Sequence, residues 1–340
     1  MDHSVFTRLD QNPIVQDNDA ICVFSVMRNE KNRLLYWLDY YRVQGVTQFF
    51  IVDNDSTDGT TDILLAQRDC IVFRTEQSYA ASRCGVDWLN AMLDEYGVGR
   101  WCMVVDVDEL FVFSKSIGTR LPDIIAKAEA EGAEGVFTLM IDMYAPTAMS
   151  EVRYQSGTSF LTQCNAFDAK PYVAFPVKEC PYVNVVGGVR QRLFYPEFSR
   201  RSLSDRIKWK IGNWFNISKW KFVKPPVVSK VPFVKWQKGR AHISGAHTVT
   251  PLKLFSARCA LLHFKFFEDF HDKALEEIKR NQHYDGAREY RRYFDFFSKN
   301  PGFSFKAQNT ALYETPDDLE RLHLITAIGG NPTNIESLKK

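Results

Sequence analysis

The sequence predicts an α/β fold in which a mostly parallel sheet is flanked by helices. Short apolar runs alternate with helical periodicity from residue 21 to residue 106, the pattern of repeated strand–helix units. Two of these runs end abruptly in acidic residues, at Val52-Asp53 and at Val105-Asp106. The chain contains no Gly-x-Gly-x-x-Gly fingerprint, which disfavours a dinucleotide-binding Rossmann domain.

Glycine, proline and short polar residues separate the expected elements. In order, these are a strand at 21–27, a helix from 29 to a stop at 45, a strand at 48–53, a short helix at 63–64, a strand at 71–74, a helix at 82–96, a strand at 101–106, a short strand at 109–113, a helix at 121–130 and a strand at 136–143. Prolines, glycines and aromatic residues crowd 150–250, which favours strands and long loops folded over a site. Helical periodicity returns after residue 251, and Thr315 opens a last amphipathic helix.

The stretch from Trp101 to Phe111 is an apolar strand that delivers three carboxylates at its tip, those of Asp106, Asp108 and Glu109. Ligands of open α/β sheets bind outside the carboxyl ends of such strands. Two carboxylates on alternate positions repel each other unless a cation lies beside them, and carboxylate oxygens suit Mg²⁺ or Mn²⁺. The alternative is a solvated acidic turn, which gives no reason for so apolar a strand before it.

A second polar tip follows the strand at 48–53. Asp53 to Thr60 consists almost wholly of Asp, Asn, Ser and Thr, which can accept hydrogen bonds from ribose hydroxyls or a base edge. The same residue types favour turns and helix caps, so a plain strand-to-helix turn is an equally good interpretation.

Three motifs follow one another along the chain: Met27-Arg28-Asn29-Glu30, then Val52 to Thr60, and then Asp106-Val107-Asp108-Glu109. Through these motifs, in this order, the chain resembles the nucleotide-sugar-dependent glycosyltransferases of the GT-A fold, in the bacterial family 2-like branch. The resemblance covers roughly residues 20 to 145. It implies a nucleotide-sugar-binding half at 20–145 after an extension at 1–19, an acceptor-side region at 146–265 and a C-terminal helical segment at 266–340. It also implies Mn²⁺ or Mg²⁺ as cofactor.

The resemblance assigns roles to individual residues. The residues expected to bind the nucleotide are Arg28, Asn29, Glu30, Asp53, Asp55 and Asp106. Asp108 is the expected direct metal ligand, and Asp106 is expected to touch the ribose or to reach the metal through water. Glu109 is expected to assist the chemistry by orienting a neighbour.

A histidine late in the fold is expected to complete the metal site. His247 is favoured because it lies in a polar loop beside Gly245, and His242 is the spare. His263 lies among apolar residues, where a core role is more common than metal binding. Lys265 or Arg83 is expected to approach the diphosphate, together with Arg28.

Family 2 enzymes typically invert the anomeric carbon and use a carboxylate base on the acceptor side. No clear Glu-Asp pair appears where that base is expected. Asp142 is the favoured candidate, with Asp168 and Glu179 as alternatives, and the stereochemical outcome stays open.

The net charge of +2 predicts no bulk attraction to nucleic acid. Basic residues nevertheless crowd the segment 190–240, interleaved with Trp209, Trp214, Trp220 and Trp236. Such a mixture suits peripheral contact with a membrane or an anionic acceptor, and equally suits a solvated insertion with its aromatics against the core.

Seven cysteines without a Cys-x-x-Cys pair are expected to be reduced and mostly buried. The first residues carry no signal-peptide pattern, and no apolar run is long enough to span a bilayer, so we expect a cytoplasmic protein.

Together these features predict a metal-dependent glycosyltransferase that moves a sugar from a nucleotide diphosphate sugar, expected to be a UDP-sugar, to a glycan or a lipid-linked saccharide. One alternative is a non-catalytic nucleotide-sugar or glycan-binding protein. The other is a haloacid-dehalogenase-like phosphatase, in which the first Asp of Asp-x-Asp is the nucleophile. That motif usually follows the first strand, whereas Asp106 lies at the end of the fourth expected strand.

Overall fold

The computed structural model describes residues 5–177, 180–199, 224–244, 246–282, 284–300 and 302–338. Its first half contains β1 (Thr7–Arg8), β2 (Cys22–Met27), α1 (Lys31–Gln44), β3 (Gln48–Asp53), α2 (Thr60–Leu65), β4 (Cys70–Arg74), α3 (Val86–Tyr96), β5 (Trp101–Val104), β6 (Glu109–Val112), α4 (Leu121–Ala130) and β7 (Gly135–Tyr144). Its second half contains β8 (Ala166–Asp168), β9 (Tyr172–Pro176), β10 (Val183–Gly187), α5 (Gly188–Phe194), α6 (Pro196–Ser199), β11 (Ser229–Lys235), β12 (His242–Ser244), β13 (Thr248–Val249), β14 (Cys259–His263), α8 (Phe270–Arg280), α9 (Tyr284–Lys299), β15 (Thr310–Leu312) and α10 (Pro316–Arg321).

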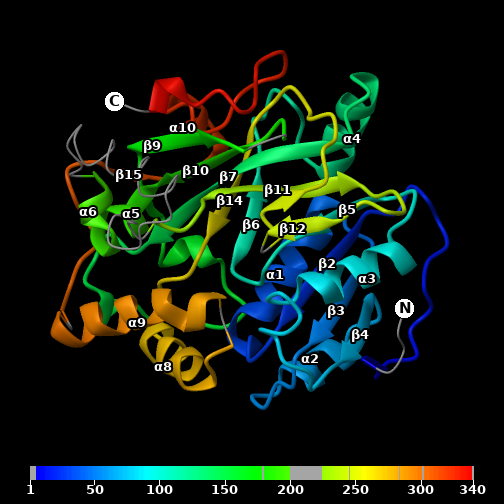
Figure 1. Cartoon of the computed structure of the whole chain (residues 1–340), viewed down its shortest axis with the longest axis horizontal. Coiled ribbons are helices and arrows are strands. Elements are labelled where there is room, and N and C mark those ends of the chain that lie inside the picture. The colour runs from blue at the N-terminus through cyan, green and yellow to red at the C-terminus, as the bar shows by residue number, and fades with distance from the viewer. Residues whose placement is uncertain are drawn as a thin grey trace, which may run out of the picture.

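The fold is α/β, with a central sheet in the order β1-β4-β3-β2-β5-β11-β7-β14-β6 (Figure 1). The strands β4, β3, β2 and β5 run parallel, as the strand–helix alternation predicts. Beyond β5 the sheet is mixed, because β11 is antiparallel to both β5 and β7, and β14 is parallel to β7 but antiparallel to β6.

Helices cover both faces of the parallel half. Neighbouring residues of a strand point to opposite faces of the sheet. In β3 the ring of Phe49 lies 5.5 Å from Trp37 of α1, whereas the ring of Phe50 lies 5.0 Å from Tyr96 of α3. The six residues of β3 are all buried, which explains why its four central residues, Phe49 to Val52, are all apolar.

Several element boundaries differ from the prediction. The helix expected at 82–96 begins at Val86, because Arg83, Cys84 and Gly85 adopt positive φ angles that no helix accommodates. The helical pattern expected after residue 251 begins only at Phe270, and the strand β14 precedes it. By contrast, α4 spans the predicted 121–130.

The ends of the chain are tied to the rest of the fold. The strand β1 pairs with β4 at the edge of the sheet, whereas Val15, later in the segment 1–19, contacts Gln48 of β3 and Arg100 before β5. Within 266–340, α8 and α9 pack side by side (Figure 1), and β15 adds a strand beside β8. Thr315 and Asp318 form a reciprocal capping box that begins α10, as the sequence predicts.

All seven cysteines are free, five of them buried, in line with the sequence prediction. Among the described residues, no helix combines the length and the apolar character needed to cross a bilayer.

Candidate active site

A switch in strand order marks the site. The chain moves outward from β2 to β3 and β4, and then returns to pair β5 with the other side of β2. Ligands of open α/β sheets bind in the crevice that such a switch creates at the carboxyl ends of the strands. A cleft of about 2270 Å³ lies there, and its lining includes Arg28 after β2 and both Asp106 and Asp108 after β5. Residues of the first sequence motif (Met27 to Glu30) and of the third (Asp106 to Glu109) therefore lie at one crevice.

The acidic turn after β5 is built around Glu109. The Glu109 side chain is 1% exposed, and its Oε2 accepts hydrogen bonds from the Asp106 amide at 3.0 Å and from Lys230 Nζ of β11 at 2.7 Å. Burial raises the pKa of Glu109 above its ordinary value, although Lys230 opposes that rise. With Glu109 turned inward, the side chains of Asp106 and Asp108 are left 66% and 25% exposed. Glu109 thus fixes the backbone of Asp106, and its expected part in the chemistry stays a prediction.

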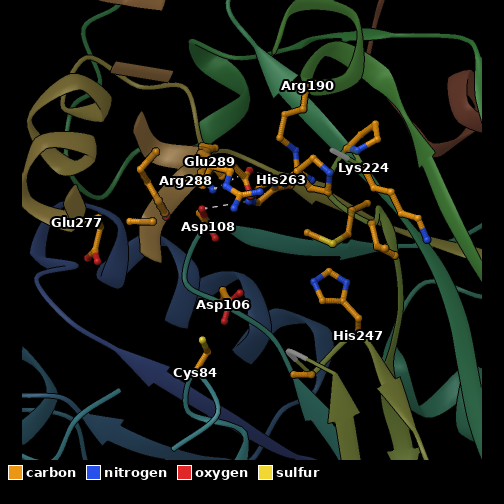
Figure 2. Close-up of a pocket in the computed structure, with 18 of the residues that line it drawn as sticks. Cys84, Asp106, Asp108, Arg190, Lys224, His247, His263, Glu277, Arg288 and Glu289 are labelled. Atoms are coloured by element: carbon orange, nitrogen blue, oxygen red, sulfur yellow. Dashed lines mark hydrogen bonds and ion pairs between the residues drawn. The ribbon is translucent and has the colours of Figure 1, made fainter. Parts of the chain in front are cut away.

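His263 is the histidine that contacts the acidic turn. Its Nε2 lies 3.3 Å from Asp108 Oδ2 (Figure 2), and its Nδ1 lies 2.7 Å from Asp142 Oδ1. Burial would lower the pKa of His263, but Asp108 and Asp142 outweigh burial and raise it to about 9. Burial would likewise raise the pKa of Asp108, but His263 and Lys265 hold it well below its usual range. The apolar residues around His263 predict a core role, and they do not reveal that this histidine ends β14 beside Asp108.

Asp142, the favoured candidate base, has both oxygens engaged. Oδ1 faces His263, and Oδ2 accepts from Arg190 Nε of α5 at 2.8 Å. Asp142 is 3% exposed, and burial, which would raise its pKa, is outweighed by Arg190 and His263. This arrangement suits a residue that orients His263, and Asp142 is not among the residues that line the cleft. A carboxylate that fixes a histidine in this way is common behind metal ligands.

The other two predicted histidines lie apart from Asp108. His247 lines the cleft, with its Nδ1 2.9 Å from the carbonyl oxygen of Ser229. His242 is 1% exposed, and its ring stacks on Trp236 at 5.6 Å. Burial, reinforced by Lys230, lowers the pKa of His242 to about 3 and that of His247 to about 4, so both rings are neutral near pH 7.

Residues of the predicted nucleotide site mainly join the loops after β2 and β3. Arg28 Nη1 donates to the carbonyl oxygen of Asn54 at 2.7 Å, and Asn29 Oδ1 accepts from the Thr57 amide at 2.8 Å. Asp53 is completely buried, and its oxygens accept from the Ser56 amide and from the Thr61 hydroxyl. Asp53 therefore closes the turn, in keeping with the strand-to-helix interpretation.

Asp55 remains 38% exposed and pairs with Arg74. Solvent can therefore reach Asp55, unlike the buried Asp53.

Helix α8 covers the end of the cleft formed by the loops after β2 and β3, and the sequence did not indicate this contact. Glu276 accepts from Asn29 Nδ2 at 2.9 Å, and Arg280 Nη2 donates to Asn54 Oδ1 at 3.1 Å. Lys273 Nζ donates to Glu30 Oε2 at 2.7 Å. These contacts join α8 to the first two motifs across more than 200 residues of sequence. No local sequence pattern reports such a contact.

The remaining candidates occupy different places. Lys265 lines the cleft, with its ammonium 4.7 Å from the centroid of the Tyr290 ring and 4.0 Å from Glu289 Oε1. Arg83 pairs with Asp87 on the surface at the cleft margin. Asp168 is 1% exposed and is held by Arg192 at 2.7 Å and by Tyr144 at 2.7 Å. Glu179 lies outside the described residues.

The basic segment 190–240 divides into two parts. Its described bases include five that pair with acidic side chains, namely Arg190, Arg192, Lys230, Lys235 and Arg240. The range 200–223, which holds Trp209, Trp214 and Trp220, lies outside the described residues. The predicted membrane or acceptor contact through this segment therefore stays a prediction.

The donor set fits a metal that also takes ligands from its substrate. Within the described part of the chain, no three or more His, Cys, Asp or Glu side chains form a ready-made metal cluster. Mg²⁺ and Mn²⁺ commonly bind through one or two carboxylates together with substrate phosphates. Asp108, the exposed Asp106 and the carboxylate-oriented His263 meet that requirement.

No family model and no curated protein matches this chain. Among solved structures, one that matches is assigned to a glucose-1-phosphate thymidylyltransferase from Bacillus anthracis in complex with sucrose. The match has 9% identity and a TM-score of 0.26, and it covers 41% of this chain and 65% of that chain. The chain thus spans just under two thirds of that structure, and a TM-score this low carries no argument about function.

Proposed function

We propose that this chain is a metal-dependent glycosyltransferase of GT-A type that uses a nucleotide diphosphate sugar, most simply a UDP-sugar. The observation that carries the proposal is the position of Asp106 and Asp108 at the strand-order switch, with Asp108 in contact with His263. A carboxylate pair at that crevice is where a metal-bound diphosphate would lie.

The charges lining the cleft support an anionic donor. Arg28, Lys265, Lys273 and Arg280 all line it, in addition to Asp106 and Asp108. Guanidinium and ammonium groups bind phosphate oxygens through charge-assisted hydrogen bonds. We place the nucleoside between the loops after β2 and β3 and helix α8, and the diphosphate beside the acidic turn.

In this proposal Asp108, Asp106 and His263 would hold Mn²⁺ or Mg²⁺, which when bound would supply positive charge against the departing nucleoside diphosphate. Because a metal ligand must be deprotonated, Nε2 of His263 would give up its proton on binding. Asp142 fixes the ring of His263 through Nδ1, so that Nε2 is directed at the metal position. Glu109 and Lys230 fix the backbone that carries Asp106. The acceptor is proposed to be a glycan or a lipid-linked saccharide, which enters from the side of β9–β10 and β12–β13.

The apolar residues of that side support an acceptor with an apolar part. Val173, Phe175, Pro176, Pro226 and Ile243 line the cleft there, and the Ile243 side chain is half exposed. A lipid-linked saccharide would place its sugar at the acidic turn and its apolar part along this wall.

Calorimetric titration of UDP, with and without Mn²⁺, tests the proposal. We expect binding that requires Mn²⁺ and that weakens at least about tenfold in Asp108→Ala. Asp39→Ala is the matched control, because Asp39 is 70% exposed on α1 and its removal should leave binding unchanged. GDP and dTDP are run beside UDP.

Two results would contradict the proposal. One is the absence of Mn²⁺-dependent binding for all three nucleotides. The other is Asp106-dependent hydrolysis of p-nitrophenyl phosphate without nucleotide binding, which would favour the phosphatase alternative. Nucleotide binding without consumption of any UDP-sugar would instead favour the non-catalytic alternative.

A further inference from the structure

The proposed transfer requires a base for the acceptor hydroxyl, and the acids on the acceptor side suit that task poorly. Asp142 and Asp168 have both oxygens engaged by basic groups or hydroxyls. Glu289 lines the cleft, but Tyr293, Arg190 and Lys265 all surround its Oε1. Burial would raise the pKa of Glu289, but Lys265 and Arg190, together with the hydrogen bond from Tyr293, lower it further than burial raises it. Glu289 Oε1 is therefore already occupied by a hydroxyl and two cations.

His247 has a free lone pair on the cleft. Its Nδ1 lies 2.9 Å from the carbonyl oxygen of Ser229, and a carbonyl only accepts, so Nδ1 carries the proton. In the neutral ring the lone pair then lies on Nε2. No described residue makes a recorded contact with Nε2. Figure 2 shows the ring on the cleft wall opposite α8 and α9, facing the open space beside Asp106.

Strand β11 holds His247 and the acidic turn in one fixed arrangement. Ser229 accepts from the His247 ring, and the Val231 amide donates to the His247 carbonyl oxygen at 3.1 Å. Between these two residues, Lys230 donates to Glu109, which in turn binds the Asp106 amide. Three consecutive residues of a buried strand therefore set the position of His247 relative to Asp106. A catalytic group must be preorganised in this way to act efficiently.

We propose that His247 is the general base of the transfer, an inference that rests on the proposed function. Nε2 takes the proton from the acceptor hydroxyl. The acceptor oxygen then forms a bond to the anomeric carbon, while the bond from that carbon to the β-phosphate oxygen breaks and its electron pair leaves with UDP. The proton passes from the imidazolium to solvent.

The neutral state of the ring agrees with this role. Burial and the nearby Lys230 lower the pKa of His247 to about 4, close to that of an ordinary carboxylate base. The ring is therefore free to accept a proton at pH 7.

The test compares His247→Asn with His323→Asn. His323 is exposed at the end of α10 and has a positive φ, which asparagine tolerates. Mn²⁺-dependent UDP binding is measured by calorimetry, and UDP release from UDP-glucose, UDP-galactose and UDP-N-acetylglucosamine is measured with and without added acceptors. We expect His247→Asn to bind UDP within about twofold of the unmodified protein and to release UDP about 10² to 10⁴ times more slowly. Added imidazole should restore part of that rate, and His323→Asn should behave like the unmodified protein.

The outcomes separate the two proposals. Loss of Mn²⁺-dependent UDP binding in His247→Asn would make His247 a metal ligand, as the sequence suggested, and would overturn the base role. Retention of the rate within threefold would also overturn it. Failure of the unmodified protein to bind UDP would instead overturn the proposed function. Nitrogen-15 NMR provides a check independent of turnover, since at pH 7 we expect a proton on Nδ1 of His247 and none on Nε2.

Discussion

Replacing Lys230 with methionine should destabilise the protein strongly, because it leaves a buried carboxylate without its cation. The Lys230 and Glu109 side chains are 3% and 1% exposed, and their charged atoms lie 2.7 Å apart. Removing one member of a buried ion pair typically costs about 3–5 kcal/mol. With an unfolding entropy of about 2.1 cal/mol/K per residue over 340 residues, that cost lowers the melting temperature by about 4–7 °C.

The same strand offers a matched control. Lys235 Nζ also lies 2.7 Å from a carboxylate, that of Glu129, but these side chains are 40% and 44% exposed. Exposed pairs contribute about 0–1 kcal/mol, so Lys235→Met should lower the melting temperature by about 1 °C or less. The two variants make the same chemical change at the same distance and differ mainly in burial.

A double variant tests the physical reason. In Lys230→Met/Glu109→Gln the glutamine is neutral, and its side-chain oxygen can still accept from the Asp106 amide. Because replacing both members of a buried pair is often neutral, this variant should regain most of the stability that Lys230→Met loses. Melting is followed by circular dichroism at pH 7. Equal losses in Lys230→Met and Lys235→Met, or a double variant no more stable than Lys230→Met, would refute the reasoning.

Three further predictions concern stability. Asp53→Ala should lower the free energy of unfolding, measured in urea, by about 1–3 kcal/mol, because two donors lose their buried acceptor. Asp55→Ala should lower it by less than about 1 kcal/mol, and equal effects of the two changes would contradict the turn role of Asp53. Because the fold lowers the pKa of His242, the unfolded chain binds more protons than the folded one below about pH 6.5. The free energy of unfolding of the unmodified protein should therefore fall by about 2 kcal/mol between pH 7 and pH 5, and His242→Phe should not show that fall. Gly85→Ala should cost about 1–3 kcal/mol, because a Cβ there lies 2.9 Å from the Tyr79 ring at a φ of +79°, and an unchanged melting temperature would contradict that strain.

The parallel half of the fold could be predicted from the sequence because its signals are local. Each of β2, β3, β4 and β5 is a short apolar run, and each lies within two residues of its predicted bounds. The strand β11 escaped notice because a buried Lys230 interrupts its apolar pattern. Burial of a lysine depends on a partner 121 residues away, which no local pattern reveals.

The candidate site was predictable only in part, for the same reason. Asp106 and Asp108 follow directly from a strand that ends in acids. The contact between His263 and Asp142 depends on the pairing of β14 with β7, in which these two residues are direct partners. Asp53 could not be assigned from its sequence, because an aspartate at a strand end suits both a ligand and a turn. In the structure its side chain accepts a hydrogen bond within the turn.

The insertion of β11 between β5 and β7 has a consequence for biosynthesis. A ribosome that has released residues 5–145 has delivered β5 and β7, yet the strand that lies between them has not been made. Until residues 229–235 emerge, both strands carry unpaired amide and carbonyl groups in the middle of the sheet rather than at its margin. Such open edges invite pairing with other chains, so a nascent or truncated chain that stops before residue 229 should depend on chaperones or aggregate. Closure of the sheet and assembly of the acidic turn with Lys230 then become a single late event in folding.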